Sequence, residues 1–155
     1  MPPSRPIQRG SWGLEVDKPL FMPPNDPHEN YRLEQAPDVT LPRLHLRVDW
    51  QTLRRLPLSG AIIFNFKALF TPLSDFRHEP YIPSICLKVL KEGKKNMMEY
   101  KNTWHTEHVA VPVLEDYVKE QEATGMIEKE WNVETLNEHP YFPGWEEQWR
   151  RKQGF

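Results

Sequence analysis

Basic and amide side chains are concentrated in one short segment, residues 46–57, which reads LRVDWQTLRRLP. It contains Arg47, Gln51, Arg54 and Arg55. A guanidinium group donates two parallel hydrogen bonds, so it suits carboxylate and phosphate oxygens. The segment therefore predicts a site for the anionic part of a ligand. The alternative is that these arginines pair with acids of the chain such as Asp49 and Glu15, which would make the cluster structural.

Histidines offer a second set of reactive groups, and the chain has six of them: His28, His45, His78, His105, His108 and His139. His45 falls on the polar side of a predicted strand, where it either points into a pocket or is an ordinary exposed imidazole. His105 and His108 are three residues apart, so a helix would place both on one side and allow metal binding. Roles at a helix start and in solvent are the simpler interpretation, so we predict no metal site.

Several classes of function lack sequence support. No G-x-S-x-G, P-loop, GxGxxG or HExxH motif is present, so nothing favours a serine hydrolase, a nucleotide-binding protein or a zincin. The formal charge of −2 provides no net field to attract nucleic acid or an anionic membrane surface. Neither a secretory signal nor a membrane-spanning apolar stretch is visible, and a single cysteine, Cys86, fits a reducing compartment. We therefore expect a cytoplasmic location.

The length and proline content limit the architecture. A chain of 155 residues has room for one domain with a modest core. Sixteen prolines against 7 glycines argue for short elements and extended connectors rather than a helical bundle. We predict the α+β class, with a flexible leader over residues 1–10, a domain over 11–130 and an aromatic-rich tail over 131–155.

Three segments have the alternation of a half-buried strand. They are residues 12–16, residues 44–48 and the aromatic run at 62–66. The stretch 19–42 holds six prolines, so it is expected to be a long irregular excursion.

Helical periodicity is found in two places and suggested in a third. Apolar residues recur at helical spacing over 81–91, with Gly93 as the stop, and over about 107–123, with Pro112 in the first turn. Asp49 is expected to cap a short helix over 50–56 that ends at Pro57. The cluster of arginines would then lie at a junction between a strand and a helix.

The segment LRVDWQTLRRLPLSGAIIFNF resembles the haem-dependent oxidative N-demethylase alpha-subunit family, whose fungal relatives are called HRQ family proteins. The matching positions are Leu46, Arg47, Gln51, Thr52, Leu53, Arg55, Leu56, Pro57, Ser59 and Gly60, followed by the apolar strand from Ile62 to Phe66. Upstream, Arg9 and Trp12 resemble the family's Arg-x-x-Trp strand, and downstream Tyr100 and Lys101 resemble its Tyr-Lys ending. The resemblance spans about residues 9–104.

The resemblance implies a PAS-like fold, an antiparallel sheet flanked by helices, that holds haem b and oxidises a small amine with dioxygen. It implies that Arg47 or Arg55 binds a haem propionate and that Gln51 orients the amine or the bound oxygen. His45 and Thr52 would lie next to the substrate. A reductase subunit or another partner chain is a further expectation.

Two departures from the family pattern affect these expectations. The family is named after a His-Arg-Gln triplet, but this chain reads Asp49-Trp50-Gln51. Family members are also generally more than twice as long, so the chain is expected to correspond to the C-terminal half, with a sheet that is incomplete on its N-terminal side. The alternatives are a noncatalytic PAS-like binding or assembly module that needs a partner chain, or a truncated gene product without independent function.

Overall fold

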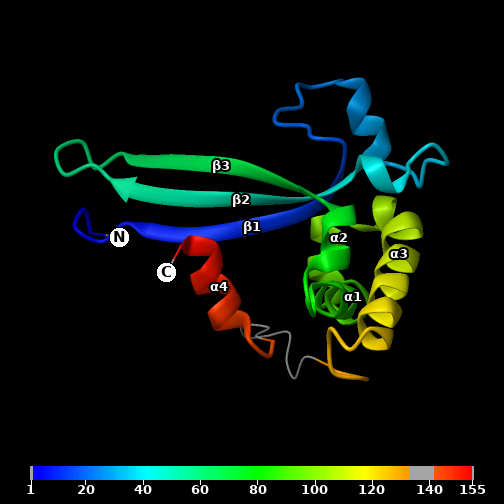
Figure 1. Ribbon diagram of the computed structural model, residues 1–155. Helices are drawn as coiled ribbons and strands as arrows, with labels where there is room; N and C mark the ends of the chain where they lie inside the picture. Colours follow the sequence, from blue (N-terminus) through cyan, green and yellow to red (C-terminus); the bar gives the residue numbers. More distant parts are fainter. Residues whose placement is uncertain (1, 133–141, 155) are drawn as a thin grey trace.

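The computed structural model describes residues 2–132 and 142–154. A three-stranded antiparallel sheet forms its centre, in the order β1 (Ile7–Val16), β2 (Leu44–Arg55), β3 (Ile62–Pro72). The strands form a long ribbon, and the helices α1 (Ile82–Glu92), α2 (Lys95–Lys101) and α3 (Trp104–Ala123) gather at one of its ends (Figure 1). The predicted α+β class, with an antiparallel sheet and flanking helices, is confirmed.

The helical part follows the sheet in the sequence. Its elements are the 3₁₀ turn η3 (Leu73–His78) and the helices α1 (Ile82–Glu92), α2 (Lys95–Lys101), α3 (Trp104–Ala123) and α4 (Trp145–Gln153). Two short 3₁₀ turns, η1 (Pro27–Arg32) and η2 (Leu41–Arg43), interrupt the otherwise irregular excursion between β1 and β2. Within the described part of the chain, none of the helices combines the length and the apolar character needed to span a bilayer.

The side chains of the sheet are buried at one end of the strands and exposed at the other end. Val16 and Leu44, where β1 ends and β2 begins, are almost completely buried, and they form the core with Leu73, Ala110 and Leu114. In contrast, the first six residues of β3 are all exposed. The helices therefore cover one end of the sheet and leave the other end, near the β2–β3 turn, open to solvent (Figure 1).

The predicted helix over 50–56 is wrong, because β2 continues as a strand to Arg55. Residues 50–53 pair with β1 on one side and with β3 on the other, for example Trp50 with Gly10 and Lys67, and residues 54–55 pair with β3 alone. This double ladder satisfies backbone groups that a helix would have satisfied locally. The chain turns back only afterwards, where Leu56 N–H donates to Ala61 O and Gly60 adopts a φ of 69°.

Other element bounds also differ from the sequence prediction. β1 begins at Ile7, so residues 7–10 of the expected leader belong to the sheet. α3 begins at Trp104 instead of 107, which places Pro112 inside the helix rather than in its first turn. α2 and α4 were not predicted. Gly93 does end α1, and any Cβ there would approach Val89 O to 2.5 Å.

Part of the aromatic tail packs on the loop before α1. The rings of Trp131 and Phe142 lie 4.8 and 5.7 Å from that of Tyr81. From α4, the Gln148 amide and the Lys152 ammonium reach the Glu79 carboxylate at 2.7 and 2.6 Å. Residues 133–141 of the tail, including Tyr141, and Phe155 lie outside the described residues.

Arg43 links the irregular segment between β1 and β2 to the residue that follows β1, Asp17. Its guanidinium donates to the Asp17 carboxylate at 2.7 and 3.0 Å and to Asp38 at 2.7 Å, and it lies 4.7 Å from the Tyr31 ring centre. The hydrogen bonds from Arg43 are the largest cause of the lowered pKa of Asp17. A carboxyl whose folded-state pKa is lowered stabilises the fold above its unfolded-state pKa, and that stabilisation disappears as the pH falls through the folded-state pKa.

We therefore predict a pH-dependent cost for the substitution Arg43→Met. The difference in unfolding free energy between the parent protein and the variant should be largest above about pH 5. It should shrink as the pH falls below the ordinary carboxyl pKa of about 4 and through the lowered pKa of Asp17 in the folded protein. Urea denaturation of both proteins between about pH 7 and about pH 2 measures this difference. A difference that stays constant over the series would contradict the assigned role of the ion pair.

Candidate functional site

The predicted site residues lie along one strand rather than at a junction. His45, Arg47, Gln51 and Arg55 occupy alternate positions of β2 and therefore share one face of the sheet, whereas Thr52 points to the opposite face. At about 3.3 Å per residue, roughly 26 Å separates the Cα atoms of Arg47 and Arg55. The structure therefore places these two arginines in different surroundings.

Arg47 lies near the covered end of the sheet with its hydrogen-bonding groups engaged. Its Nε donates to Asp49 Oδ1 at 3.0 Å, and its Nη1 donates to Pro19 O at 2.8 Å. The guanidinium also lies 5.6 Å from the ring centre of Phe70. The alternative that the sequence left open, pairing with Asp49, is thus observed for this arginine.

Arg47 and Asp49 line a polar pocket of about 420 Å³ on the β1 edge of the sheet. The remaining lining residues are Ser11 to Glu15 of β1, Arg32 of η1, and Tyr100, Lys101, Asn102 and His105 around the α2–α3 junction. The pocket therefore combines three permanently or usually cationic groups with two carboxylates. Such a mixed lining suits a small polar or zwitterionic molecule.

Lys101 joins the helical part to β1 in this pocket. Its ammonium donates to Ser11 Oγ at 3.0 Å and to Trp12 O at 2.8 Å, and it lies 5.4 Å from the centre of the Trp12 indole. Burial lowers the pKa of Lys101. Trp12 and Lys101 belong to two separate family-like motifs, and the fold brings them into direct contact.

Two of the residues that line the polar pocket, Glu15 and His105, are almost completely buried. Glu15 is 8% exposed and accepts hydrogen bonds from Arg32. His105 is 2% exposed, and its Nδ1 lies 2.6 Å from Asn102 O. Because a carbonyl can only accept, Nδ1 carries the proton, and Nε2 is a buried acceptor without a partner among the described residues. Burial is the main reason why the pKa of His105 is lowered, so this imidazole is neutral near pH 7.

Gln51 and Arg55 lie on the uncovered end of the same face. Gln51 Oε1 accepts a hydrogen bond of 2.7 Å from Arg9 Nε, which joins two further family-like positions. The amide is thereby oriented with its NH₂ group away from Arg9. The side chain of Arg55 forms no hydrogen bond or ion pair with any residue that the structure describes, and its guanidinium lies beside the turn at Gly60.

Between these polar groups lies what we call the open aromatic face, made of Ile7, Leu53, Ile62, Phe64 and Phe66. Strand pairing places Phe64 opposite Leu53 and Phe66 opposite Gln51, so the five side chains share one surface. Phe64 and Phe66 stack with ring centres 5.8 Å apart, yet they are 48% and 49% exposed. An apolar surface of this extent, left in water, indicates a site where something binds.

His45 and Thr52 do not join either group. His45 is 5% exposed, its Nδ1 contacts Arg43 O at 3.1 Å, and its ring meets the edge of Phe70. Thr52 projects from the other face of β2. In the described part of the chain, no cluster of three or more His, Cys, Asp or Glu side chains is arranged to hold a metal ion.

Sequence reasoning did not assign roles to Arg9, Glu15, Arg32, Lys101 or His105 in a site. The only available signals were the Arg-x-x-Trp and Tyr-Lys motifs, which are distant from Gln51 and Arg47 in the sequence. Their contacts are created by strand pairing and by the packing of α2 on β1.

A comparison with family models matches residues 1–111 to the haem-dependent oxidative N-demethylase, alpha subunit-like family. The chain belongs to this family. The match covers all three strands, α1, α2 and the start of α3. It therefore includes both the polar pocket and the open aromatic face.

Proposed function

We propose that this chain provides one wall of a haem-binding site in an oxidoreductase that resembles oxidative N-demethylases of small amines. The observation that supports the proposal most directly is the open aromatic face. It carries apolar side chains between the Gln51–Arg9 pair and the guanidinium of Arg55, which has no partner within residues 2–132 and 142–154. A flat apolar surface with a cation at its border matches the two chemical parts of haem b, a planar ring and anionic propionates.

The residues of this face fit haem as one side of a pocket. Phe64, Phe66 and Leu53 would contact the ring, and Arg55 would donate to a propionate. When bound, haem would supply the activation of dioxygen for oxidation of the amine. Arg47 fits a propionate less well than Arg55, because Asp49 and Pro19 O already occupy its donors.

Gln51 has the geometry of a positioning group. Arg9 holds its carbonyl oxygen, so the amide NH₂ is available to donate to a substrate or to an oxygen atom. The altered triplet does not disturb this arrangement, because Asp49 and Trp50 carry other contacts and Gln51 itself is present. His45 and Thr52 are left out of the proposal, since one is buried and the other lies on the opposite face.

Addition of hemin to the purified chain tests the proposal. We expect a Soret band, with a spectral change on addition of a secondary amine. The substitution Arg55→Ala should weaken haem retention about 10-fold or more, which corresponds to the loss of a charge-assisted hydrogen bond of about 1.5–3 kcal/mol.

Arg54→Ala is the matched control, because Arg54 neighbours Arg55 in the sequence but projects from the other face of β2. Haem retention should stay unchanged in this variant. Equal losses in both variants, or no loss in Arg55→Ala, would contradict the propionate role.

A second candidate is a noncatalytic module that a partner chain completes, and the uncovered end of the sheet favours it. Ile63 and Leu69, on the opposite face from Phe64, are also 51% and 41% exposed, so both faces of β3 offer apolar surface. Within the described residues β3 has only β2 as a neighbour. Absence of a Soret band, together with a melting temperature that rises when a partner subunit is added, would support this function over the first. A cytoplasmic location agrees with either candidate.

A further inference from the structure

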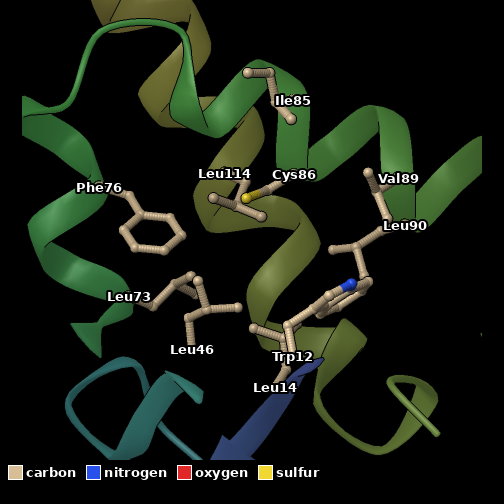
Figure 2. Close-up of a pocket in the computed structure, with 10 residues that line it drawn as sticks. All are labelled: Trp12, Leu14, Leu46, Leu73, Phe76, Ile85, Cys86, Val89, Leu90 and Leu114. Carbon is tan, nitrogen blue, oxygen red and sulfur yellow. The ribbon is translucent and has the colours of Figure 1, made fainter. Parts of the chain in front are cut away.

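A cavity on the other side of the sheet differs in chemistry from the site described above. It lies between the covered end of the sheet and the helices, and its volume is about 230 Å³. The lining residues are Trp12, Leu14 and Leu46 from β1 and β2, Leu73 and Phe76 from η3, Ile85, Cys86, Val89 and Leu90 from α1, and Leu114 from α3. In Figure 2 these side chains surround one common space.

The lining of this apolar cavity offers almost nothing for water to bind. All ten residues are hydrophobic except for the indole N–H of Trp12 and the thiol of Cys86. Burial raises the pKa of Cys86 to about 12, so the thiol is uncharged near pH 7. A water molecule in a protein interior is held by about 2 to 4 polar partners. This lining does not provide them, so the cavity is a poor site for water.

The same lining excludes the ligands of the proposed function. Haem propionates need cations, and a protonated amine needs an acceptor or an aromatic cage. Neither a basic nor an acidic side chain lines the cavity. Its volume of about 230 Å³ is also below the lower end of the range for cofactor sites, about 300 Å³.

The volume and the apolar lining of the cavity instead match a small apolar molecule. An apolar cavity of about 150 Å³ is large enough to bind benzene. A cavity of 230 Å³ with comparable walls therefore has room for a ring with one or two small substituents, or for a fused pair of rings.

We propose that the cavity between the sheet and α1 is a binding site for a small, neutral, apolar molecule about the size of toluene to naphthalene. Burial of the ligand's apolar surface drives binding, and the absence of polar partners provides selection against charged analogues. Arg47, Gln51 and Arg55 lie on the opposite face of the sheet, whereas Trp12 and Leu14 line both this cavity and the polar pocket.

Cys86 is the single cysteine of the chain and therefore reports on the cavity. Toluene should raise the melting temperature of the full chain and slow the modification of Cys86 by a small methanethiosulfonate. At a toluene concentration of about ten times Kd, the labelling rate should fall roughly 10-fold by mass action. Benzylamine, which is protonated at pH 7, has nearly the same shape and should produce neither effect.

Two variants of α1 distinguish the cavity from other surfaces. Val89→Phe places a ring in the cavity and should remove the response to toluene, and Ile85→Phe is a second filling variant in case the first does not fold. Lys91→Phe adds the same ring on the exposed side of α1 and should leave the response unchanged. An effect of toluene that survives filling, an equal effect of benzylamine, or no effect of toluene would overturn the proposal. So would a labelling rate that falls as protein concentration rises, because a side chain of a second copy would then be the occupant.

Discussion

Replacing Gln121 with alanine is expected to lower the free energy of unfolding by about 3–5 kcal/mol, although the residue belongs neither to the polar pocket nor to the open aromatic face. Gln121 is 1% exposed. Its amide nitrogen lies 3.3, 3.0 and 3.1 Å from the carbonyl oxygens of Phe76, Arg77 and Glu79, and its Oε1 accepts from Tyr81 N–H at 3.2 Å. One side chain therefore bridges several backbone groups of the connection from η3 to α1.

The loss should be large because alanine would leave Tyr81 N–H and Arg77 O without the partner that Gln121 provides. The carbonyl oxygens of Phe76 and Glu79 would keep the N–H groups of Glu79 and Ile82. Tyr81 increases the cost, since its φ of 68° is unfavourable for a bulky residue and persists only where surrounding contacts enforce it. Urea denaturation at pH 7 measures the effect.

Two further variants control for the network. Lys119→Ala changes an exposed position of the same helix and should alter the unfolding free energy by less than about 0.5 kcal/mol. Gln121→Glu keeps the shape but directs a carboxylate at three carbonyl oxygens, so it should be more destabilising at neutral pH than near pH 4, roughly the carboxyl's ordinary pKa. A cost for Gln121→Ala similar to that of Lys119→Ala would refute the bridging role.

The second large effect concerns two leucines of the sheet. Leu44→Ala should cost about 3–5 kcal/mol of unfolding free energy, whereas Leu69→Ala should cost less than about 1 kcal/mol. The reason is burial: Leu44 is fully buried against the helices, and Leu69 is 41% exposed. The lost transfer free energy and the cavity both arise only where neighbours surround the side chain.

The comparison also tests whether the sheet is covered in solution. Equal costs at Leu44 and Leu69 would mean that a partner packs on β3 at the working concentration. Repeating the denaturation at several protein concentrations identifies a second copy as that partner, because the midpoint would then rise with concentration.

Local patterns in the sequence predicted the secondary structure elements that depend mainly on neighbouring residues. Alternation identified the three strands, and helical spacing identified α1 and most of α3. The motif around Arg47, Gln51 and Pro57 pointed to the family that the comparison then showed. Each of these inferences needs only residues that are near one another in the chain.

The tertiary structure decided what depends on pairing between distant residues. Residues 50–55 look like a capped turn of helix, but their pairing with β3, and that of residues 50–53 with β1 as well, makes them a strand and so places Thr52 on the opposite face from Gln51. Leu44 and Leu69 look alike in the sequence, but only one lies under the helices. The contacts Arg9–Gln51 and Lys101–Trp12 join residues that are 42 and 89 positions apart. Side-chain periodicity reports which residues share a face of an element, whereas burial and partners depend on what packs against that face.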